Sequence, residues 1–190
     1  MSALQPAVFL DRDGTIIEEA GYPDRLERIV FFPFSVDAVR TLNGGRFAVV
    51  VVTNQSGIAR GIVPEAFVGE AHRYIAERMQ AGGARIDAFY YCRHHPEAFD
   101  LSLRGPCDCR KPQPGLLRRA AADLGLDLSR SFIVGDRWQD VAAGQAVGAR
   151  GLLVRTGVGR EQEQRTDASV PGVLIVDDLA AAAASILQQA

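Results

Sequence analysis

The sequence predicts an α/β protein built on a doubly wound, mostly parallel sheet. Short runs of β-branched and aromatic residues alternate along the chain with segments of helix length. These runs are apolar throughout instead of alternating with polar residues, which is typical of strands covered on both faces. The chain has 190 residues, of which 47% are hydrophobic and 23% charged, so we expect one globular domain spanning residues 1–190.

The first half of the chain contains three expected strands and two expected helices. The strands are Ala7–Leu10, Phe47–Val52 and Ala88–Tyr91. A helix at Val36–Leu42 is followed by a pair of glycines, which commonly end helices. The clearest helix is Pro64–Gln80, since proline is tolerated at a first helical position and apolar residues recur every fourth position. A second glycine pair ends it, and His72 on this helix is expected to face solvent.

The second half continues the same alternation. Strands are expected at Phe132–Val134, Leu152–Val154 and Val173–Val176. Helices are expected at Leu116–Leu124, Gln139–Val147 and the alanine-rich Leu179–Gln188. Two stretches fit neither element: residues 92–115, rich in Cys, His, Pro and Arg, and the polar segment Gly157–Pro171, which is predicted to be a loop.

Polar residues follow three of the expected strands at the point where each ends. The first strand leads into Asp11-Arg12-Asp13-Gly14-Thr15, the second into Thr53-Asn54-Gln55-Ser56-Gly57, and the fourth into Gly135-Asp136-Arg137 with Asp140 close behind. Ligands of open parallel sheets bind beyond the carboxyl ends of the strands. Residues 11–15 alone would equally fit a simple turn, but the three segments in this order predict a site.

The acidic residues at these strand ends suit phosphoryl transfer assisted by a metal ion. In an extended chain Asp11 and Asp13 point the same way while Arg12 faces elsewhere, and two such carboxylates repel unless a cation lies between them. Mg²⁺ accepts one or two carboxylates together with a phosphate oxygen, which Asp11 and Asp136 could supply. One aspartate could then attack a phosphoryl group while the other moves protons. Thr53 and Lys111 are candidates to stabilise the transferring group.

The three cysteines of the chain lie close to a histidine in sequence. Cys92-x-His94 and Cys107-x-Cys109 form two close pairs, and a Cys₃His set is a recognised tetrahedral zinc site. Because all four ligands would be used, the zinc would be structural and would stabilise a loop of about residues 92–109 that leads directly to Arg110 and Lys111. His95 could replace His94 as the ligand. The alternative is three reduced cysteines without metal, and the odd count makes a disulfide framework improbable.

Four motifs in order resemble those of the haloacid-dehalogenase superfamily of phosphatases: FLDRDGT, VVTNQSG, CRKPQPG and VGDRWQD. The resemblance implies a Rossmann-like fold with Asp11 as nucleophile and Asp13 as general acid and base. It also implies that Thr53 and Lys111 stabilise the phosphoryl group. Asp11, Asp136 and the backbone carbonyl of Asp13 would bind Mg²⁺. Larger members carry an inserted cap domain, but residues 16–46 already include a helix and leave no room for one.

Among members with a zinc loop, the chain is more similar to heptose bisphosphate phosphatases than to histidinol-phosphate phosphatases. The likeness extends through TNQSGIARG, YYCRHHP, CDCRKPQPG and VRTG. It implies loss of the C7 phosphate of a heptose 1,7-bisphosphate, a step toward activated heptose for lipopolysaccharide. The implied substrate contacts are Glu19, Ala20, Gly21, Tyr22, Thr53, Asn54, Gln55, Ser56, Arg110, Lys111 and Arg137. Arg137 departs from the pattern, since lysine is common there. Histidinol phosphate remains the alternative substrate.

Composition and charge exclude other classes of function. A net charge of −2 argues against nucleic acid as the main partner, and against a zinc-knuckle binding module despite the basic residues near the zinc loop. A phosphomutase would need a cap to exclude water.

The chain has no apolar run long enough to span a membrane and no visible secretory signal, so we expect a cytoplasmic monomer. Asp140 could support the magnesium ligands or act as a favourable charge at a helix start.

Overall fold

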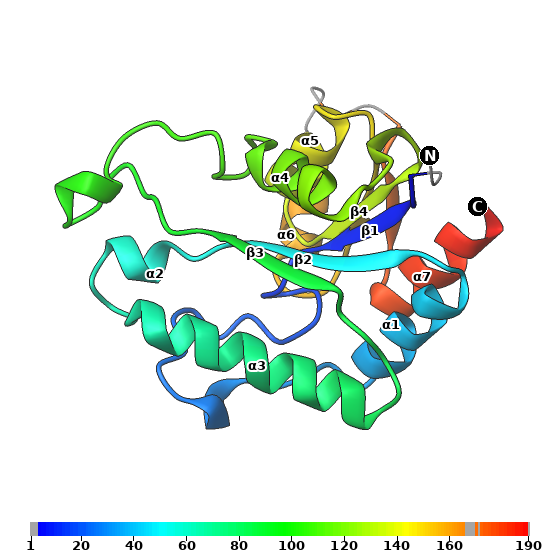
Figure 1. The fold of residues 1–190 in the computed structure, drawn as a ribbon, viewed down its shortest axis with the longest axis horizontal. Coiled ribbons are helices and arrows are strands. Elements are labelled where there is room, and N and C mark those ends of the chain that lie inside the picture. The colour runs from blue at the N-terminus through cyan, green and yellow to red at the C-terminus, as the bar shows by residue number, and fades with distance from the viewer. Residues whose placement is uncertain (1–3, 166–169, 171, 190) are drawn as a thin grey trace.

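The computed structural model describes residues 4–165, 170 and 172–189, and within them the core is one sheet of six strands (Figure 1). The strand order is β3-β2-β1-β4-β5-β6, and every neighbouring pair is parallel. The bounds are β1 (Ala7–Leu10), β2 (Ala48–Asn54), β3 (Ala88–Cys92), β4 (Phe132–Gly135), β5 (Arg150–Val154) and β6 (Leu174–Val176). The predicted parallel sheet is therefore confirmed, with each strand at its expected place.

Helices connect the strands, and all five expected helices are present. The α-helices of the described residues are α1 (Ser35–Gly44), α2 (Ser56–Ala59), α3 (Glu65–Ala81), α4 (Gly115–Leu124), α5 (Trp138–Gln145), α6 (Gly159–Gln164) and α7 (Leu179–Gln188). Short 3₁₀ turns lie at Leu26–Arg28, Leu101–Leu103 and Leu128–Arg130. Pro64 precedes α3 in an extended conformation instead of beginning it, because its ψ is 138°.

The prediction of a polar loop at Gly157–Pro171 is wrong in part. Residues 159–164 form α6, which was missed because its glutamate- and glutamine-rich turns carry no apolar stripe. Residues 166–169 and 171 of the same stretch lie outside the described part of the chain. The four-residue helix α2 was also missed, since it is shorter than any periodic pattern can reveal.

The two faces of the sheet are covered by different helices. One face packs against α1, α3 and α7, and the other against α4 and α5 (Figure 1). All four residues of β1 are 0% exposed, which explains why its sequence is apolar without alternation. Among the described residues, no helix has both the length and the apolar character needed to cross a bilayer.

The order of the strands reverses between β1 and β4, and this reversal decides where a ligand can bind. In doubly wound sheets the crevice lies at this point, beyond the carboxyl ends of the strands. Between β1 and α1 the chain contains only the 3₁₀ turn at Leu26–Arg28, and between β2 and α3 only α2. The segment between β1 and α1 therefore contains no inserted cap domain, as expected from its length, and the crevice is bordered by loops.

His72 does not face solvent as its helical position predicted. It is 8% exposed, and its ring stacks on Phe89 at 4.7 Å and meets Tyr91 edge-on at 5.6 Å. Burial, reinforced by the nearby Arg12 guanidinium, lowers the pKa of His72 to about 3, so the imidazole is neutral. The apolar repeat of α3 did not reveal this, because the aromatic partners belong to β3.

Candidate active site

Three buried carboxylates meet at the point where the strand order reverses. Asp11 follows β1, Asp136 follows β4, and Asp140 lies in the first turn of α5. They offer ligand oxygens within 4.8 Å of one another, and we call these three residues the oxygen cluster. Asp140 was predicted only as a helix-start charge or a support for the magnesium ligands. The contacts of Asp140 favour the supporting role, because Asp140 and Asp11 both contact Lys111.

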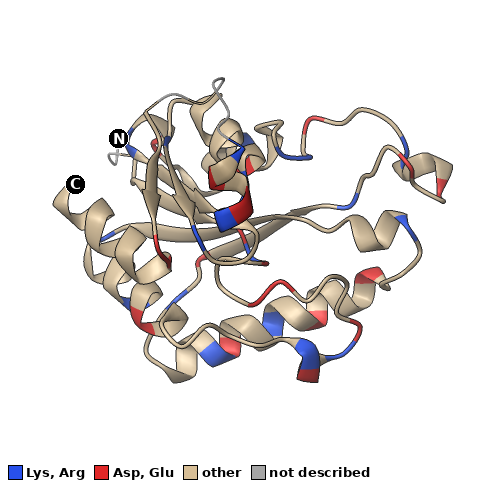
Figure 2. Ribbon diagram, turned by 180° about the vertical axis from the view of Figure 1, so that it is seen from behind, with Lys and Arg blue, Asp and Glu red and all other residues tan. Residues whose placement is uncertain are grey.

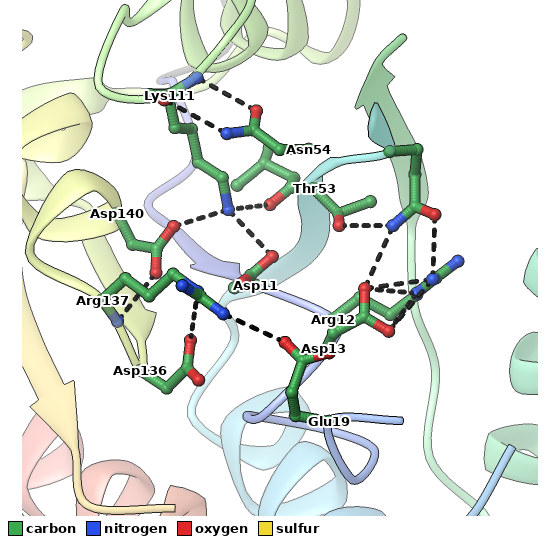
Figure 3. A network of polar contacts seen from close by, with 12 residues as sticks. Asp11, Arg12, Asp13, Glu19, Thr53, Asn54, Lys111, Asp136, Arg137 and Asp140 are labelled. Atoms are coloured by element: carbon green, nitrogen blue, oxygen red, sulfur yellow. Dashed lines mark hydrogen bonds and ion pairs between the residues drawn. The ribbon is translucent and has the colours of Figure 1, made fainter. Parts of the chain in front are cut away.

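Lys111 is the cation of this cluster and is 1% exposed. Its Nζ lies 2.8 Å from Asp11 Oδ1 and 2.7 Å from Asp140 Oδ1, and it donates to the Val52 carbonyl at 2.8 Å (Figure 3). Burial alone would lower the pKa of Lys111, but the carboxylates of Asp11 and Asp140 outweigh it and raise that pKa above its ordinary value. The lysine is therefore charged and held beside the expected nucleophile.

Asn54 fixes the backbone of Lys111. Its side-chain nitrogen donates to the Lys111 carbonyl and its oxygen accepts from the Lys111 amide, both at 3.1 Å (Figure 3). Asn54 was predicted as a substrate contact. It borders the pocket, but both ends of its amide are used to join the end of β2 to the segment that follows the cysteine loop.

The oxygen cluster has the electrostatic character of a cation site. Burial raises the pKa of Asp11 to about 6 against the lowering effect of Lys111, and burial followed by the charges of Asp11 and Asp140 raises that of Asp136 to about 8. Asp136 Oδ2 accepts from the Val158 amide at 2.9 Å, whereas its Oδ1 has no hydrogen-bond partner among the described residues. These buried hard oxygens fit Mg²⁺, which prefers carboxylate ligands.

Two glycines allow the chain to pass close to Asp136. A Cβ on Gly14 or on Gly157 would lie 2.2 Å from Asp136 Oδ2, and both glycines have positive φ, at 79° and 57°. The loop after β5 is further tied to the first motif by Thr156, whose Oγ1 donates to the Gly14 carbonyl at 2.6 Å. The VRTG segment thus helps to shape the site, a role that its sequence alone did not indicate.

Asp13 lies on the opposite side of Asp11 from Lys111, and Arg12 does not face away from it as predicted. The Arg12 guanidinium contacts both carboxylate oxygens of Asp13 at 3.0–3.2 Å (Figure 3). The expectation failed because β1 ends at Leu10, so the alternation of an extended strand no longer applies to residues 11–13. Asp11 and Asp13 nevertheless border the same pocket.

A pocket of about 350 Å³ opens over these residues. The predicted catalytic residues Asp11 and Asp13 border it, and so do most predicted substrate contacts: Glu19, Gly21, Tyr22, Thr53, Asn54, Gln55, Ser56, Arg110 and Arg137. Ala20 and Lys111 do not border the pocket, and Lys111 lies buried beneath it. His95, Gln139 and Gly57 border it without having been predicted for that role, and their only sequence signal was adjacency to motif residues.

The outer wall of the pocket is polar and is organised by ion pairs. Glu19 accepts from Arg137 at 3.2 Å and from the Gly21 amide at 3.0 Å, which orders the turn after β1. The Tyr22 hydroxyl lies 3.3 Å from Ser56 Oγ. Across the chain, acidic and basic residues are interspersed over the helices and loops (Figure 2). At the pocket, in contrast, the two kinds of charge are separated. The carboxylates of the oxygen cluster are buried, and Arg110 and Arg137 border the pocket above them.

The cysteine loop forms a second candidate metal centre. Cys92 Sγ lies 3.0 Å from Cys109 Sγ and 3.7 Å from Cys107 Sγ, and His94 Nδ1 is 3.6 Å from Cys92 and 3.3 Å from Cys109. The four ligand atoms lie within 4.8 Å of one another, and we call them the sulfur–nitrogen cluster. Tetrahedral zinc with ~2.3 Å Zn–S bonds places its sulfurs ~3.8 Å apart. The Cys92–Cys107 and Cys107–Cys109 separations, 3.7 and 3.5 Å, are close to this value, and the Cys92–Cys109 separation is shorter. The chemistry of the Cys₃His donor set fits zinc.

The geometry distinguishes His94 from His95 as a member of this cluster. His95 Nδ1 instead accepts from the Glu97 amide at 3.0 Å, and its Nε2 lies 3.4 Å from Arg60. His94 rather than His95 therefore completes the cluster.

Burial raises the pKa of the Cys92 thiol, so a thiolate there requires a bound cation.

Comparisons by sequence and by structure both find proteins named as heptose bisphosphate phosphatases. The HAD-hydrolase-like family model matches residues 108–182. The chain is 40% identical to D-glycero-beta-D-manno-heptose-1,7-bisphosphate 7-phosphatase of Photorhabdus laumondii, over 92% of each chain. It is 43% identical to the protein of the same name from Escherichia coli K12, over 83% of each.

The fold is similar to the crystal structure of D,D-heptose 1.7-bisphosphate phosphatase from B. bronchiseptica complexed with magnesium and phosphate. That likeness has a TM-score of 0.86 at 32% identity and covers 98% of this chain and 100% of that one. The corresponding phosphatase from Burkholderia thailandensis gives a TM-score of 0.71 at 31% identity, covering 96% and 99%.

Proposed function

The chain belongs to the D-glycero-beta-D-manno-heptose-1,7-bisphosphate 7-phosphatase family of haloacid-dehalogenase-like phosphatases, and we propose that it removes the C7 phosphate of that bisphosphate to leave heptose 1-phosphate. One observation carries the proposal. Asp11 is held 2.8 Å from the buried Lys111, between Asp13 and Asp136, at the base of a pocket bordered by Arg110 and Arg137. The relatives are named for the β anomer, and we propose the same anomer here.

Each of the central residues has a role in the proposed hydrolysis. Asp11 attacks the phosphorus and forms an aspartyl phosphate, while Asp13 protonates the leaving sugar oxygen. Asp13 then takes a proton from the water that hydrolyses the aspartyl phosphate. The Thr53 hydroxyl and the charged Lys111 stabilise the equatorial oxygens, and Asp140 keeps Lys111 in place.

The magnesium site proposed here consists of Asp11, Asp136 and the Asp13 backbone carbonyl. A bound Mg²⁺ would neutralise the carboxylates and polarise a phosphate oxygen. Asp136 Oδ1 has no hydrogen-bond partner among the described residues and only a 3.8 Å ion pair with Arg137 Nε, which supports this assignment, as does the magnesium named with the B. bronchiseptica phosphatase. We also propose a structural zinc on Cys92, His94, Cys107 and Cys109, supported by their distances from one another.

The phosphate that does not react requires its own cationic partners. Arg110 donates to the His94 carbonyl at 3.0 Å and Arg137 pairs with Glu19, so both guanidinium groups border the pocket in fixed positions. Guanidinium groups bind phosphate bidentately, and we propose that these two orient the C1 phosphate. Glu19, Ala20, Gly21 and Tyr22 would form the wall against the sugar.

Phosphate release tests the proposal. The purified protein, with Mg²⁺, is assayed against both anomers of the heptose 1,7-bisphosphate and against histidinol phosphate, and ³¹P NMR identifies which phosphate is lost. We expect the β heptose bisphosphate to have the highest kcat/KM and to lose only its C7 phosphate. A preference for histidinol phosphate would refute the substrate assignment. A single domain, a monomeric state and a cytoplasmic location remain predictions; size-exclusion chromatography with light scattering checks the second.

A further inference from the structure

Arg12 is a buried cation that the proposed reaction does not use. It lies between Asp11 and Asp13 in sequence, yet it is 2% exposed and does not border the pocket. Burying an ion pair costs several kcal/mol per ion in desolvation, and such pairs often stabilise a fold no better than apolar side chains would. The pairing of Arg12 with Asp13, the expected acid and base, therefore calls for a reason other than folding.

The guanidinium of Arg12 has partners on every side. Its Nε and Nη2 donate to both oxygens of Asp13, and Nη2 also donates to Gln55 Oε1 at 3.0 Å. Its remaining nitrogen, Nη1, lies 3.4 Å from His72 Nε2. Since a guanidinium can only donate, the His72 nitrogen must present its lone pair, and the ring proton must be on Nδ1.

Gln55 closes a ring around Asp13. Its Nε2 donates to Asp13 Oδ2 at 3.0 Å and to Thr53 Oγ1 at 2.9 Å, so the amide has one orientation that satisfies all its neighbours. Both oxygens of Asp13 thus accept hydrogen bonds from fixed donors, although the side chain is 17% exposed toward the pocket. The carboxylate cannot rotate without breaking several of these bonds.

His72 anchors this arrangement from a distant part of the sequence. It comes from the middle of α3, and its ring is confined between Phe89 and Tyr91 of β3. Because the ring is neutral, it can accept from Arg12 without adding a second buried charge. A helix that takes no direct part in the pocket is thereby connected to the proton-transferring residue.

We propose that Arg12, anchored by His72, is a positioning residue that holds the Asp13 carboxyl group toward the leaving oxygen, to which its protonated form gives a proton, and then holds the resulting carboxylate toward water. The inference rests on the roles assigned to Asp11 and Asp13 in the proposed function. Neither Arg12 nor His72 borders the pocket. Their effect is on geometry, and misplacing a catalytic group by about 1 Å can lower a rate by up to ~100-fold.

Three variants of α3 test the inference. His72→Phe keeps an aromatic ring against Phe89 but removes the acceptor, whereas His72→Gln keeps an acceptor without the ring. Glu70→Gln, on an exposed position of the same helix, is the matched control. We expect His72→Phe to lower kcat and kcat/KM for the heptose bisphosphate by about tenfold with KM unchanged. His72→Gln should recover to within about threefold of the parent, and the control should match the parent.

The leaving group provides a readout that a merely structural role would not change. Nitrophenolate leaves without being protonated, so kcat/KM for p-nitrophenyl phosphate should fall less than about twofold in His72→Phe. Equal losses of kcat/KM on both substrates in His72→Phe would overturn the inference. So would an unchanged kcat for the heptose bisphosphate together with a lowered melting temperature. If the unsubstituted protein itself failed to hydrolyse the heptose bisphosphate, the proposed function would be wrong instead. Hydrolysis of p-nitrophenyl phosphate alone would not support that function.

Discussion

The molecule has two candidate metal centres at the same end of the sheet, and they are held in place in opposite ways. The residues of the oxygen cluster come from the ends of β1 and β4 and the start of α5, and all of them are buried. In the sulfur–nitrogen cluster only Cys92 belongs to a strand. Its other ligands lie in an irregular loop, where Ala98 and Leu103 pack on Ala59 and where Cys107 and Cys109 lie against the edge of the core.

This difference indicates what each metal is for. The strands of the sheet bring the carboxylates of the oxygen cluster together without a bound cation. Burial and crowding disfavour the ionised carboxylates, which raises the pKa values of Asp11 and Asp136. The loop buries few apolar side chains, and the proposed zinc would join its ligands. We therefore propose the first centre for chemistry, and the second for folding of the segment that leads to Arg110 and Lys111.

Asp11→Asn should have the largest effect, because it removes the nucleophile from the rigid centre. We expect kcat to fall by at least about 10³-fold, as when a catalytic nucleophile is lost elsewhere. Lys111 retains Asp140 as a partner, so the melting temperature should stay near that of the parent. Phosphate release and circular dichroism measure the two quantities. Activity above a few per cent of the parent would show that Asp11 is not the nucleophile.

Cys107→Ser should break the loop and leave the sheet intact. We expect loss of bound zinc, faster proteolysis within residues 93–106, and a KM raised by about tenfold because Arg110 and Lys111 lose their anchor. Metal analysis, limited proteolysis and steady-state kinetics report on these. Asp100→Asn in the same loop is the control, since Asp100 only caps the 3₁₀ turn there. Full zinc content in Cys107→Ser would remove the sulfur–nitrogen cluster from the comparison.

The stability of the magnesium-free protein should depend on pH in a direction set by the oxygen cluster. Folding raises the pKa of Asp136 from 3.8 to about 8 and that of Asp11 to about 6, so the folded state binds more protons than the unfolded state between these values. Their stabilising contribution is complete below pH 3.8 and is lost as pH rises through about 6 and then about 8.

Thermal unfolding between pH 5.5 and 8.5 tests that dependence, with chelator or with Mg²⁺. We expect the melting temperature to fall by several degrees across this range without Mg²⁺, since ~1 kcal/mol corresponds to about 2–4 °C in a domain of this size. Mg²⁺ binds the ionised carboxylates and should flatten the curve. Asp136→Asn should flatten it without Mg²⁺. Identical slopes in all conditions would contradict the assignment of the cation site.

Asn54→Ala should have the smallest effect and tests whether the two centres are coupled. It removes two hydrogen bonds to the Lys111 backbone, and we expect kcat/KM to fall about fivefold, equivalent to about 1 kcal/mol, while zinc remains bound. Asn43→Ala is a matched control, because Asn43 makes the same pair of bonds to the Arg85 backbone far from the site. An equal change in kcat/KM for both variants would show that the bond pair stabilises the fold without coupling the centres.

Much of this architecture could be predicted from sequence because its signals are local. Strands buried on both faces read as unbroken apolar runs, which located β1 and β4 and with them Asp11 and Asp136. The paired spacing of the cysteines indicated a metal loop. Errors arose where a partner lies elsewhere in the chain. His72 was assigned to solvent because its stack comes from β3, and α6 was taken for a loop because its sequence has no apolar stripe.

By itself, the sequence determined the fold class, the strand ends that carry the acidic residues, and the three cysteines of the sulfur–nitrogen cluster, because hydrophobic pattern and motif spacing depend only on neighbours along the chain. The choice of His94 over His95 came from the structure. Only the tertiary structure decided that Asp140 shares Lys111 with Asp11, that Asn54 clamps Lys111, and that Arg12 turns toward Asp13 with His72 behind it. These contacts join residues from different elements. Their geometry depends on how the helices pack on the sheet, which no local pattern specifies.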